Sequence, residues 1–447
     1  MKENDQSSKK HLYRAIWRWH FYAGVIFAPI LIMLAVTGAI YLYKPQIQEI
    51  MYKDLYEVKQ QGNPLSANEQ VIKVQEQYPD SPITRVRPAD SPTRSTEVGI
   101  DHKGENMTIF INPYNGKIMG DLKDDSMFME FVKKLHGELM VGTIGDRIVE
   151  LAACWAIILL VTGLYLWFPR DKNWNGFFNI RLKQGKRTFY RDLHVFLGFW
   201  LSLFIILLIL TGLPWAGFMG DKINQVATST QSGYPNALWD EVPESYVPTK
   251  SVGTVPWAAE NMPLPKSNIN GTNGIFLNSV VEIAEKRNVH PGYNIYLPGD
   301  ETGVYTVSVF PTFPKDQATL HIDQYSGKVL ADLRFDDYGW MAKVIEVGIA
   351  LHEGRYFGPF NQFLGLLTCL GLVLIVWSGF IMWWKRRPTG KLGAPTLSNQ
   401  FKMSKTLIAI TILLGILLPL VGISLLAVLI IDFVLIKRIP RLREWFA

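Results

Sequence analysis

The sequence is poor in charge, in cysteine and in nucleotide-binding motifs. Only 19% of its 447 residues are charged, against about a quarter in soluble domains. Its two cysteines, Cys154 and Cys369, both lie inside apolar runs. This placement excludes a disulfide scaffold and argues against metal–thiolate chemistry. No G-x-G-x-x-G motif stands in a strand–turn–helix context and no Walker A motif occurs.

Long hydrophobic runs take up much of the chain instead. A helix crosses the hydrocarbon core of a bilayer with about 20 residues, and four runs reach that length. These runs are Phe21–Tyr43, Ile148–Phe168, Val195–Phe218 and Phe363–Trp384. A fifth run, Leu407–Ile436, has Pro419 and Gly422 in its middle, which allows one tilted span or a tight hairpin. The runs exclude a soluble enzyme and predict an integral membrane protein.

Basic residues orient the spans. They cluster within residues 9–18, 169–194 and 385–387, which the positive-inside rule places in the cytoplasm together with the N-terminus. This clustering accounts for the net charge of +6 without a nucleic-acid partner. The mixed-charge stretches then lie outside, and basic residues at both ends of the fifth run favour the hairpin. The predicted order is N-terminus and first span 1–43, first outer domain 44–147, second span 148–168, basic loop 169–194, third span 195–218, second outer domain 219–362, fourth span 363–384, and a C-terminal basic loop and hydrophobic segment 385–447.

The chain repeats itself internally. His20 and His194 each lie 17 residues before a Thr-Gly pair. His136 and His352 each lie 26 residues before a Thr-Gly or Ser-Gly pair. The pairs are, in the same order, Thr37-Gly38, Thr211-Gly212, Thr162-Gly163 and Ser378-Gly379. Two copies of one unit, each a helix going out, an outer domain and a helix coming back, explain these spacings.

The outer stretches match as well. Residues Ile109–Leu122 resemble Leu320–Leu333, and each reads as a strand, a glycine turn and a second strand. Helical patterns precede them at Asn68–Tyr78 and Asn278–Arg287. The predicted fold is therefore an α-helical integral membrane protein: a four-helix core from two tandem repeats, a C-terminal hairpin or fifth span, and two extracytoplasmic α+β domains.

A histidine in a membrane span is costly and indicates function. The repeat places His20 and His194 at one depth near the cytoplasmic face, and His136 and His352 at one depth near the outer face. Two facing imidazoles suit the axial positions of an iron porphyrin, so we expect two b-type haems. His11 is an alternative to His20 as ligand. Three further histidines in the outer domains are expected to be solvated: His102, His290 and His321.

Residues near the inner histidines are candidates for contacts with the macrocycle. Gly24 and Gly198 remove a side chain one turn after His20 and His194. Arg18 and Arg191 are candidates for holding propionates. Ordinary helix packing also explains such glycines, and the positive-inside rule explains the arginines. No catalytic acid or base is required, since the cofactor carries the chemistry.

These motifs together resemble the PepSY-associated transmembrane family. The resemblance covers roughly residues 10–390 and rests on segments Trp19–Tyr43, Lys134–Gly142, Asp192–Gly212 and Ala350–Gly358 and on the two outer hairpins. It implies a cytoplasmic (inner) membrane protein with PepSY-like domains outside, and some members are haem-containing ferric-siderophore reductases. Carried over by residue, the ligands fall on His20, His136, His194 and His352. The first hairpin departs from the second in having Asn112 where Asp323 stands.

The leading hypothesis is a di-haem protein that passes electrons outward to a ferric siderophore or another ferric chelate. The cytoplasmic loops are too short for a flavin or nicotinamide domain, so a quinol in the lipid bilayer or a separate reductase would donate the electrons. Two alternatives stay open. One is a membrane-anchored PepSY module that binds or inhibits proteases, and the other is a permease component for iron uptake.

Overall fold

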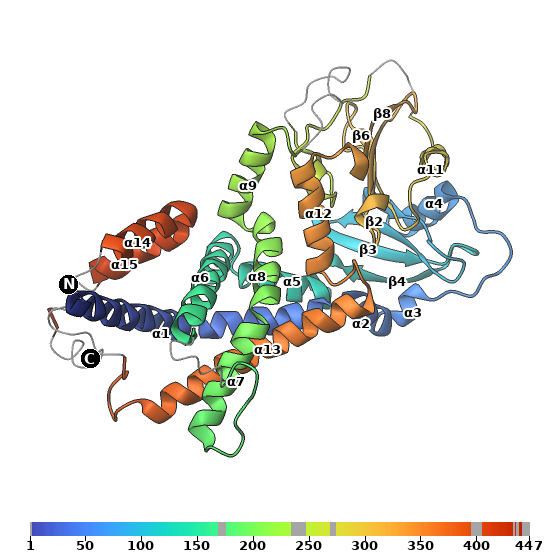
Figure 1. Ribbon diagram of the computed structural model, residues 1–447. Helices are drawn as coiled ribbons and strands as arrows, with labels where there is room; N and C mark the ends of the chain where they lie inside the picture. Colours follow the sequence, from blue (N-terminus) through green and yellow to red (C-terminus); the bar gives the residue numbers. More distant parts are fainter. Residues whose placement is uncertain are drawn as a thin grey trace. The chain divides into compact units, whose positions relative to one another are not determined.

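The structure is a computed structural model. It describes residues 2–168, 176–233, 247–268, 274–394 and 405–431, together with 434, 438 and 439. The chain divides into two compact units, which are described separately below (Figure 1). The first unit comprises residues 1–40, 133–220 and 363–447, and the second comprises residues 41–132 and 221–362.

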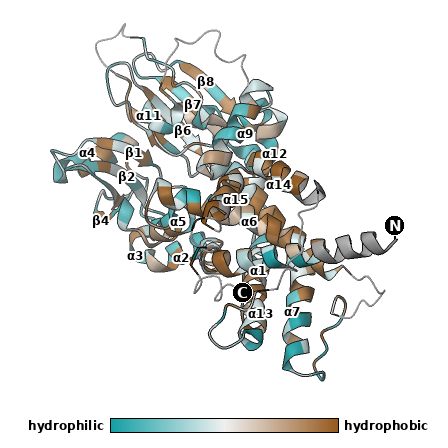
Figure 2. Cartoon of the chain, turned by 90° about the vertical axis from the view of Figure 1, so that its left-hand side faces the viewer, coloured by the Kyte–Doolittle hydropathy of each residue, from teal (hydrophilic) through white to brown (hydrophobic). Residues whose placement is uncertain are grey.

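The first unit is built from apolar helices. Three of them are long and apolar enough to cross a membrane, at Leu12–Tyr41, Thr143–Trp167 and Pro359–Arg386. The unit contains α1 (Lys2–Tyr41), most of α5 (Phe128–Glu138), α6 (Thr143–Trp167), α7 (Lys186–Trp200), α8 (Ser202–Gly212), α13 (Pro359–Arg386), α14 (Lys405–Leu417) and α15 (Pro419–Ile431). Hydrophobic residues dominate α6 and α15 (Figure 2). The chain is therefore a multi-pass membrane protein.

The third expected span is bent. Helix α7 and the segment Ser202–Trp215 meet at an angle of 54° and make a fourth span only if the pair is taken together. The break falls at Leu201, whose side chain packs against Gly371 of α13 at a point where a Cβ atom would collide with it. Hydrophobicity alone does not reveal such a bend, because the apolar run continues through it.

The fifth apolar run forms two helices. Only Leu418 separates α14 from α15, and a Cβ atom on Gly422 would lie 3.0 Å from Cα of Gly415. Residues seven apart in one straight helix are about 10.5 Å apart along its axis, so the chain reverses here. Of the two alternatives, the described residues form the hairpin.

The second unit contains one antiparallel sheet of eight strands. Its strands are β1 (Ile83–Arg87), β2 (Thr96–His102), β3 (Glu105–Ile111), β4 (Ile118–Lys123), β5 (Asn294–Tyr296), β6 (Val304–Val309), β7 (Ala318–Asp323) and β8 (Val329–Arg334), in the order β4-β3-β2-β1-β5-β6-β7-β8. Its helices are α2 (Lys44–Met51), α3 (Lys53–Tyr56), α4 (Ala67–Gln77), most of α9 (Gly217–Ser229), α10 (Trp257–Glu260), α11 (Leu277–Lys286) and α12 (Trp340–His352).

The two stretches that are expected to lie outside the membrane share this one sheet. Strand β1 of the first pairs with β5 of the second, with Val86 opposite Ile295. A four-stranded module on its own would leave an exposed edge here, and the pairing satisfies the backbone groups of both edges. This differs from the expectation of two independent outer domains.

The predicted hairpins and helices are present in each half. Strands β3 and β4 form the first hairpin, and β7 and β8 form the second. Gly116 (φ +68°) and Gly327 (φ +70°) occupy their turns in a left-handed conformation that favours glycine. Helices α4 and α11 lie next to each other and cover one face of the sheet.

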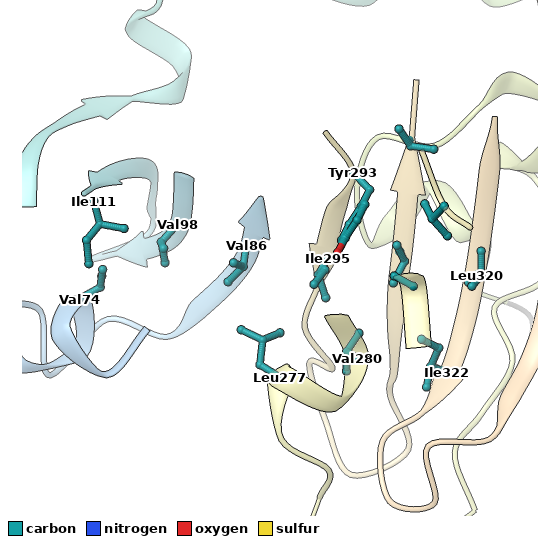
Figure 3. Close-up of a cluster of buried hydrophobic side chains, with 14 of the residues drawn as sticks. Val74, Val86, Val98, Ile111, Leu277, Val280, Tyr293, Ile295, Leu320 and Ile322 are labelled. Atoms are coloured by element: carbon teal, nitrogen blue, oxygen red, sulfur yellow. The ribbon is translucent and has the colours of Figure 1, made fainter. Parts of the chain in front are cut away.

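The core of this unit lies between that face and the two helices (Figure 3). Alternate strand residues such as Val98, Ile295 and Leu320 are fully buried there, against Val74 of α4 and Val280 of α11. Because strand side chains alternate between faces, the other residues of these strands point to the opposite face. His321 is one of them.

His321 corrects one expectation. It is fully buried, and its Nδ1 lies 3.0 Å from Oγ1 of Thr306 on the neighbouring strand. Burial lowers its pKa to about 3, so the imidazole is neutral. It occupies an interior strand, where the equivalent position of the first half holds the buried Phe110, and this explains why it is not solvated.

A histidine pair in the membrane unit

Helices α1 and α6 pack against each other in opposite directions. His20 of α1 contacts Thr162 of α6, and seven residues further along α1 the ring of Phe27 stacks on Trp155, with 5.8 Å between ring centroids. Seven residues are about two helical turns, so both contacts fall on one face of each helix. The packing therefore brings a histidine of one span against the Thr-Gly pair of another.

The hydrogen bonds of Thr162 determine the tautomer of His20. The Thr162 hydroxyl donates its proton to the carbonyl of Ile158 at 2.6 Å. It has no second proton, so its 3.0 Å contact with Nδ1 of His20 is a bond that the imidazole donates. Nδ1 thus carries the hydrogen and Nε2 carries the free lone pair. A histidine that binds a metal through Nε2 needs this form.

His194 of α7 is held in the same way by α13. Its Nδ1 lies 2.9 Å from the carbonyl oxygen of Ile375 and 3.3 Å from Oγ of Ser378. A carbonyl oxygen only accepts, so Nδ1 again carries the hydrogen and Nε2 the lone pair. Ser378 belongs to the Ser-Gly pair of the second repeat and occupies the position that Thr162 occupies in the first.

Glycine makes room for each ring. A Cβ atom on Gly163 would lie 3.1 Å from Cε1 of His20, and one on Gly379 would lie 3.3 Å from Cε1 of His194. Both distances are tighter than ordinary contacts. Each hydroxyl–glycine pair therefore supplies a hydrogen-bond acceptor and a flat backbone surface for one imidazole.

The structure brings His20 and His194 together. Their ring centroids are 6.3 Å apart and their planes are nearly perpendicular, at 85°. A metal–imidazole nitrogen bond is about 2.0 Å long and each nitrogen lies roughly 1.1 Å from its ring centre, so two axial imidazoles have centroids a little over 6 Å apart. The separation fits one metal ion held between the two rings.

His136 of α5 follows the same pattern. Thr37 of α1 donates its hydroxyl proton to the carbonyl of Met33 at 2.8 Å and lies 2.8 Å from Nδ1 of His136. Nδ1 of His136 is therefore the donor, and Gly38 lies beside the ring, where a Cβ atom would be 3.4 Å from Cε1. His352 belongs to the second unit, so its pairing with His136 stays a prediction.

The remaining candidates have varied surroundings. A Cβ atom on Gly198 would meet nothing within 4 Å, and one on Gly24 would come within 3.9 Å of Leu159. Arg18 donates to the hydroxyl of Tyr22 at 3.1 Å. Arg191 forms an ion pair of 3.2 Å with the buried Asp192, which also pairs with Arg181. The side chain of His11 lies outside the described residues.

Protein ligands beyond the histidine pair are missing from the described part of the chain. Within it, three or more histidine, cysteine, aspartate or glutamate side chains nowhere gather as a metal cluster. Two ligands alone do not complete the coordination of a transition metal. An iron porphyrin supplies four nitrogens itself, so two imidazoles are enough to complete its coordination.

Sequence reasoning identified the histidines and the hydroxyl–glycine pairs but not their contacts. Spacing along the chain relates His20 to Thr37-Gly38, whereas in space His20 meets Thr162-Gly163 and His136 meets Thr37-Gly38. The sequence did contain a signal for these contacts. When two antiparallel helices each carry a histidine near one end and a hydroxyl–glycine pair near the other, each histidine lies beside the hydroxyl–glycine pair of the other helix.

These features define a class: multi-pass membrane proteins with an apolar helical unit, an antiparallel α+β unit and a paired-histidine site in the helices. The chain belongs to the PepSY-associated TM region family, whose model matches residues 17–386, more than four fifths of its length. A search of curated proteins found no match. The hairpin of α14 and α15 lies beyond the matched region.

Proposed function

We propose that the protein is a di-haem electron-transfer protein that reduces ferric siderophores or other ferric chelates at the outer face of the cytoplasmic membrane. The observation that carries this proposal is the orientation of the histidines. In His20 and His194, Nδ1 is committed to a neighbouring helix and the lone pair is left on Nε2. Nδ1 of His136 contacts Thr37 of a neighbouring helix in the same way. Idle histidines copied by duplication have no need of this common arrangement.

When bound, haem would supply a one-electron iron centre, and the protein residues would set its surroundings. His20 and His194 would hold the inner iron, while Thr162 and Ile375 fix the two rings and raise their basicity. His136 and His352 would hold the outer iron, with Thr37 in the supporting role on His136. Gly24, Gly198, Arg18 and Arg191 remain proposed contacts of the inner macrocycle and its propionates.

The spacing along α1 suits transfer across a membrane. His20 contacts one supporting pair, and Thr37, which supports His136, lies 17 residues further along α1. At 1.5 Å per residue this is about 25 Å, most of the thickness of the hydrocarbon core. With the N-terminus in the cytoplasm, an electron moving outward gains about 2.3 kcal/mol per 100 mV of inside-negative potential. A quinol or a separate reductase would supply it.

A reduced-minus-oxidised spectrum with haem quantitation tests the proposal. The purified wild-type protein should contain two haems, and His194→Ala should lose the absorbance of one and keep the other. His290→Ala, at an exposed outer loop, is the matched control and should keep both. A folded but colourless wild-type protein would refute the proposal and favour the regulatory-module or permease hypothesis. If His194→Ala keeps both haems, the pairing is refuted.

Electron delivery needs a separate measurement. After chemical reduction, stopped-flow mixing with a ferric siderophore should reoxidise the haems within the lifetime of the reduced state. Failure of reoxidation with every ferric chelate tried would remove the substrate assignment and leave the haem assignment standing.

A further inference from the structure

The first arm of the hairpin is too short to cross a bilayer. From Lys405 to Leu417, α14 has 13 residues, which at 1.5 Å per residue is about 20 Å, against about 30 Å of hydrocarbon. Gly415 and Gly422 face each other closely at the reversal, as small residues do where membrane helices approach. The reversal therefore lies inside the membrane if the ends of the hairpin lie at one surface.

A single hydrogen bond gives the depth of the hairpin. The indole Nε1 of Trp155 donates to Oγ of Ser424 at 3.1 Å. Trp155 lies 12 residues from either end of α6, hence about 18 Å from each. Ser424 is therefore level with the midpoint of α6, and the reversal at Leu418 is six residues, or about 9 Å of helix, away from it. The reversal thus extends at most about 9 Å past the midpoint of α6 and does not reach the end of that helix.

Charge at the flanks shows which surface the hairpin faces. In the sequence, Lys437 lies 13 residues after Ser424 and opens a basic stretch through Arg443. Lys402 and Lys405 precede the hairpin. Basic residues on both flanks mark the same side as the basic end of α13, which the positive-inside rule makes cytoplasmic.

The surface of the hairpin is suited to acyl chains. Its helices are predominantly hydrophobic (Figure 2). More than half of their described side chains are exposed, among them Ile412, Leu413, Ile416, Leu417, Ile423 and Leu426. Such a surface in water would be an aggregation hazard, and in hydrocarbon it is neutral.

We propose that α14 and α15 form a re-entrant hairpin that enters the cytoplasmic leaflet, reverses inside the hydrocarbon and returns to the cytoplasm. Its partner is the acyl-chain region of that leaflet, and the bond from Trp155 to Ser424 holds it against α6. This inference rests on the multi-pass membrane fold and is independent of haem binding.

Topology mapping tests it in the full-length protein. In a background where Cys154 and Cys369 are alanine, single cysteines are introduced as Leu417→Cys beside the reversal, Lys59→Cys in the outer unit and Lys391→Cys after α13. A membrane-impermeant maleimide is applied to intact cells and to inside-out vesicles. A reporter that is active only in the cytoplasm is fused after Ala447 in a second experiment.

The reporter is expected to be active. Leu417→Cys should be labelled neither in intact cells nor in inside-out vesicles. Lys59→Cys should be labelled only in intact cells, and Lys391→Cys only in inside-out vesicles. Labelling of Leu417→Cys from the outside as fast as Lys59→Cys would show a hairpin that crosses fully and would overturn the proposal. An inactive reporter on an expressed protein would show a single span and would overturn it too. If Leu417→Cys is not expressed, Leu420→Cys on the other side of the reversal takes its place, because the reporter alone does not separate a re-entrant hairpin from one that crosses fully.

Discussion

Replacing Thr162 with valine removes the oxygen atom that accepts a hydrogen bond from His20 and changes the shape of the side chain very little. The wild-type hydroxyl accepts from Nδ1 of His20 at 3.0 Å and donates to the carbonyl of Ile158 at 2.6 Å. In Thr162→Val, the backbone carbonyl of Leu159 remains as the acceptor for the His20 imidazole. The ring loses the hydroxyl and is held less firmly in its metal-binding orientation. Losing such a supporting partner typically weakens metal binding 10–100-fold.

This range corresponds to about 1.4–2.7 kcal/mol of binding free energy. Haem titration of the apoprotein, with the two sites resolved by their spectra, measures it. The inner site should weaken while the outer site, which Thr37 supports, should not change. The midpoint potential of the inner haem should also rise, because an imidazole without this bond is a weaker donor to ferric iron.

Thr162→Ser is the matched control. Serine keeps the hydroxyl, and the second repeat itself uses Ser378 beside His194. This variant should bind haem within a few-fold of the wild type. If Thr162→Val binds inner haem with wild-type affinity and potential, the supporting role is refuted. If Thr162→Ser is as weak as Thr162→Val, packing and not the hydroxyl explains the loss.

Three further predictions follow from other contacts. Gly163→Ala should stabilise α6 as a helix by about 1 kcal/mol yet lower inner-haem occupancy, because the added Cβ would lie 3.1 Å from Cε1 of His20. Burial raises the pKa of Glu260 from 4.5 to about 7, so between these pH values the folded state holds a proton that the unfolded state has lost. The unfolding free energy of the wild type should therefore fall as pH rises from about 4.5 to 7, by at most about 1.4 kcal/mol per pH unit. Glu260→Gln should remove this pH dependence. Ser66→Ala should destabilise the second unit by about 1 kcal/mol, because Ser66 and Glu69 form a capping box at the start of α4.

Each of these has its own check. Gly299→Ala, in the second unit, adds a methyl group where nothing lies within 4 Å, so it should leave the occupancy measured by haem quantitation unaltered. Thermal unfolding across pH checks Glu260→Gln, and a wild-type stability that rises over this window would contradict the assigned pKa. Denaturant unfolding checks Ser66→Ala, with Ser66→Asp as the variant that should retain the cap.

Several features of this protein were determined by local sequence patterns. The hydrophobic runs predicted the membrane helices, because about 20 apolar residues leave few other structures. Helices α4 and α11 and both glycine-turn hairpins lie where periodicity and turn residues placed them. The four candidate histidines were identified by equal spacing, which duplication preserves.

Other features depend on which surfaces meet. The spacing of His20 from Thr37 revealed the repeat but not the contact partner of His20, which is Thr162, because α1 and α6 pack in opposite directions. The single sheet exists because β1 and β5 are edge strands that satisfy each other, although they are more than 200 residues apart. The reversal at Leu418 needed the close approach of Gly415 and Gly422.

The histidine tautomers show most clearly which properties follow from the sequence and which need the packed structure. Residue type and position along the chain were enough to identify imidazoles at the ends of membrane spans. Which imidazole nitrogen carries the hydrogen depends on where the neighbouring threonine hydroxyl donates its own proton. That proton goes to a backbone carbonyl one turn earlier in the helix of the threonine. That information exists only once the helices are packed, because a hydrogen bond requires a distance and a direction that no spacing along the chain contains.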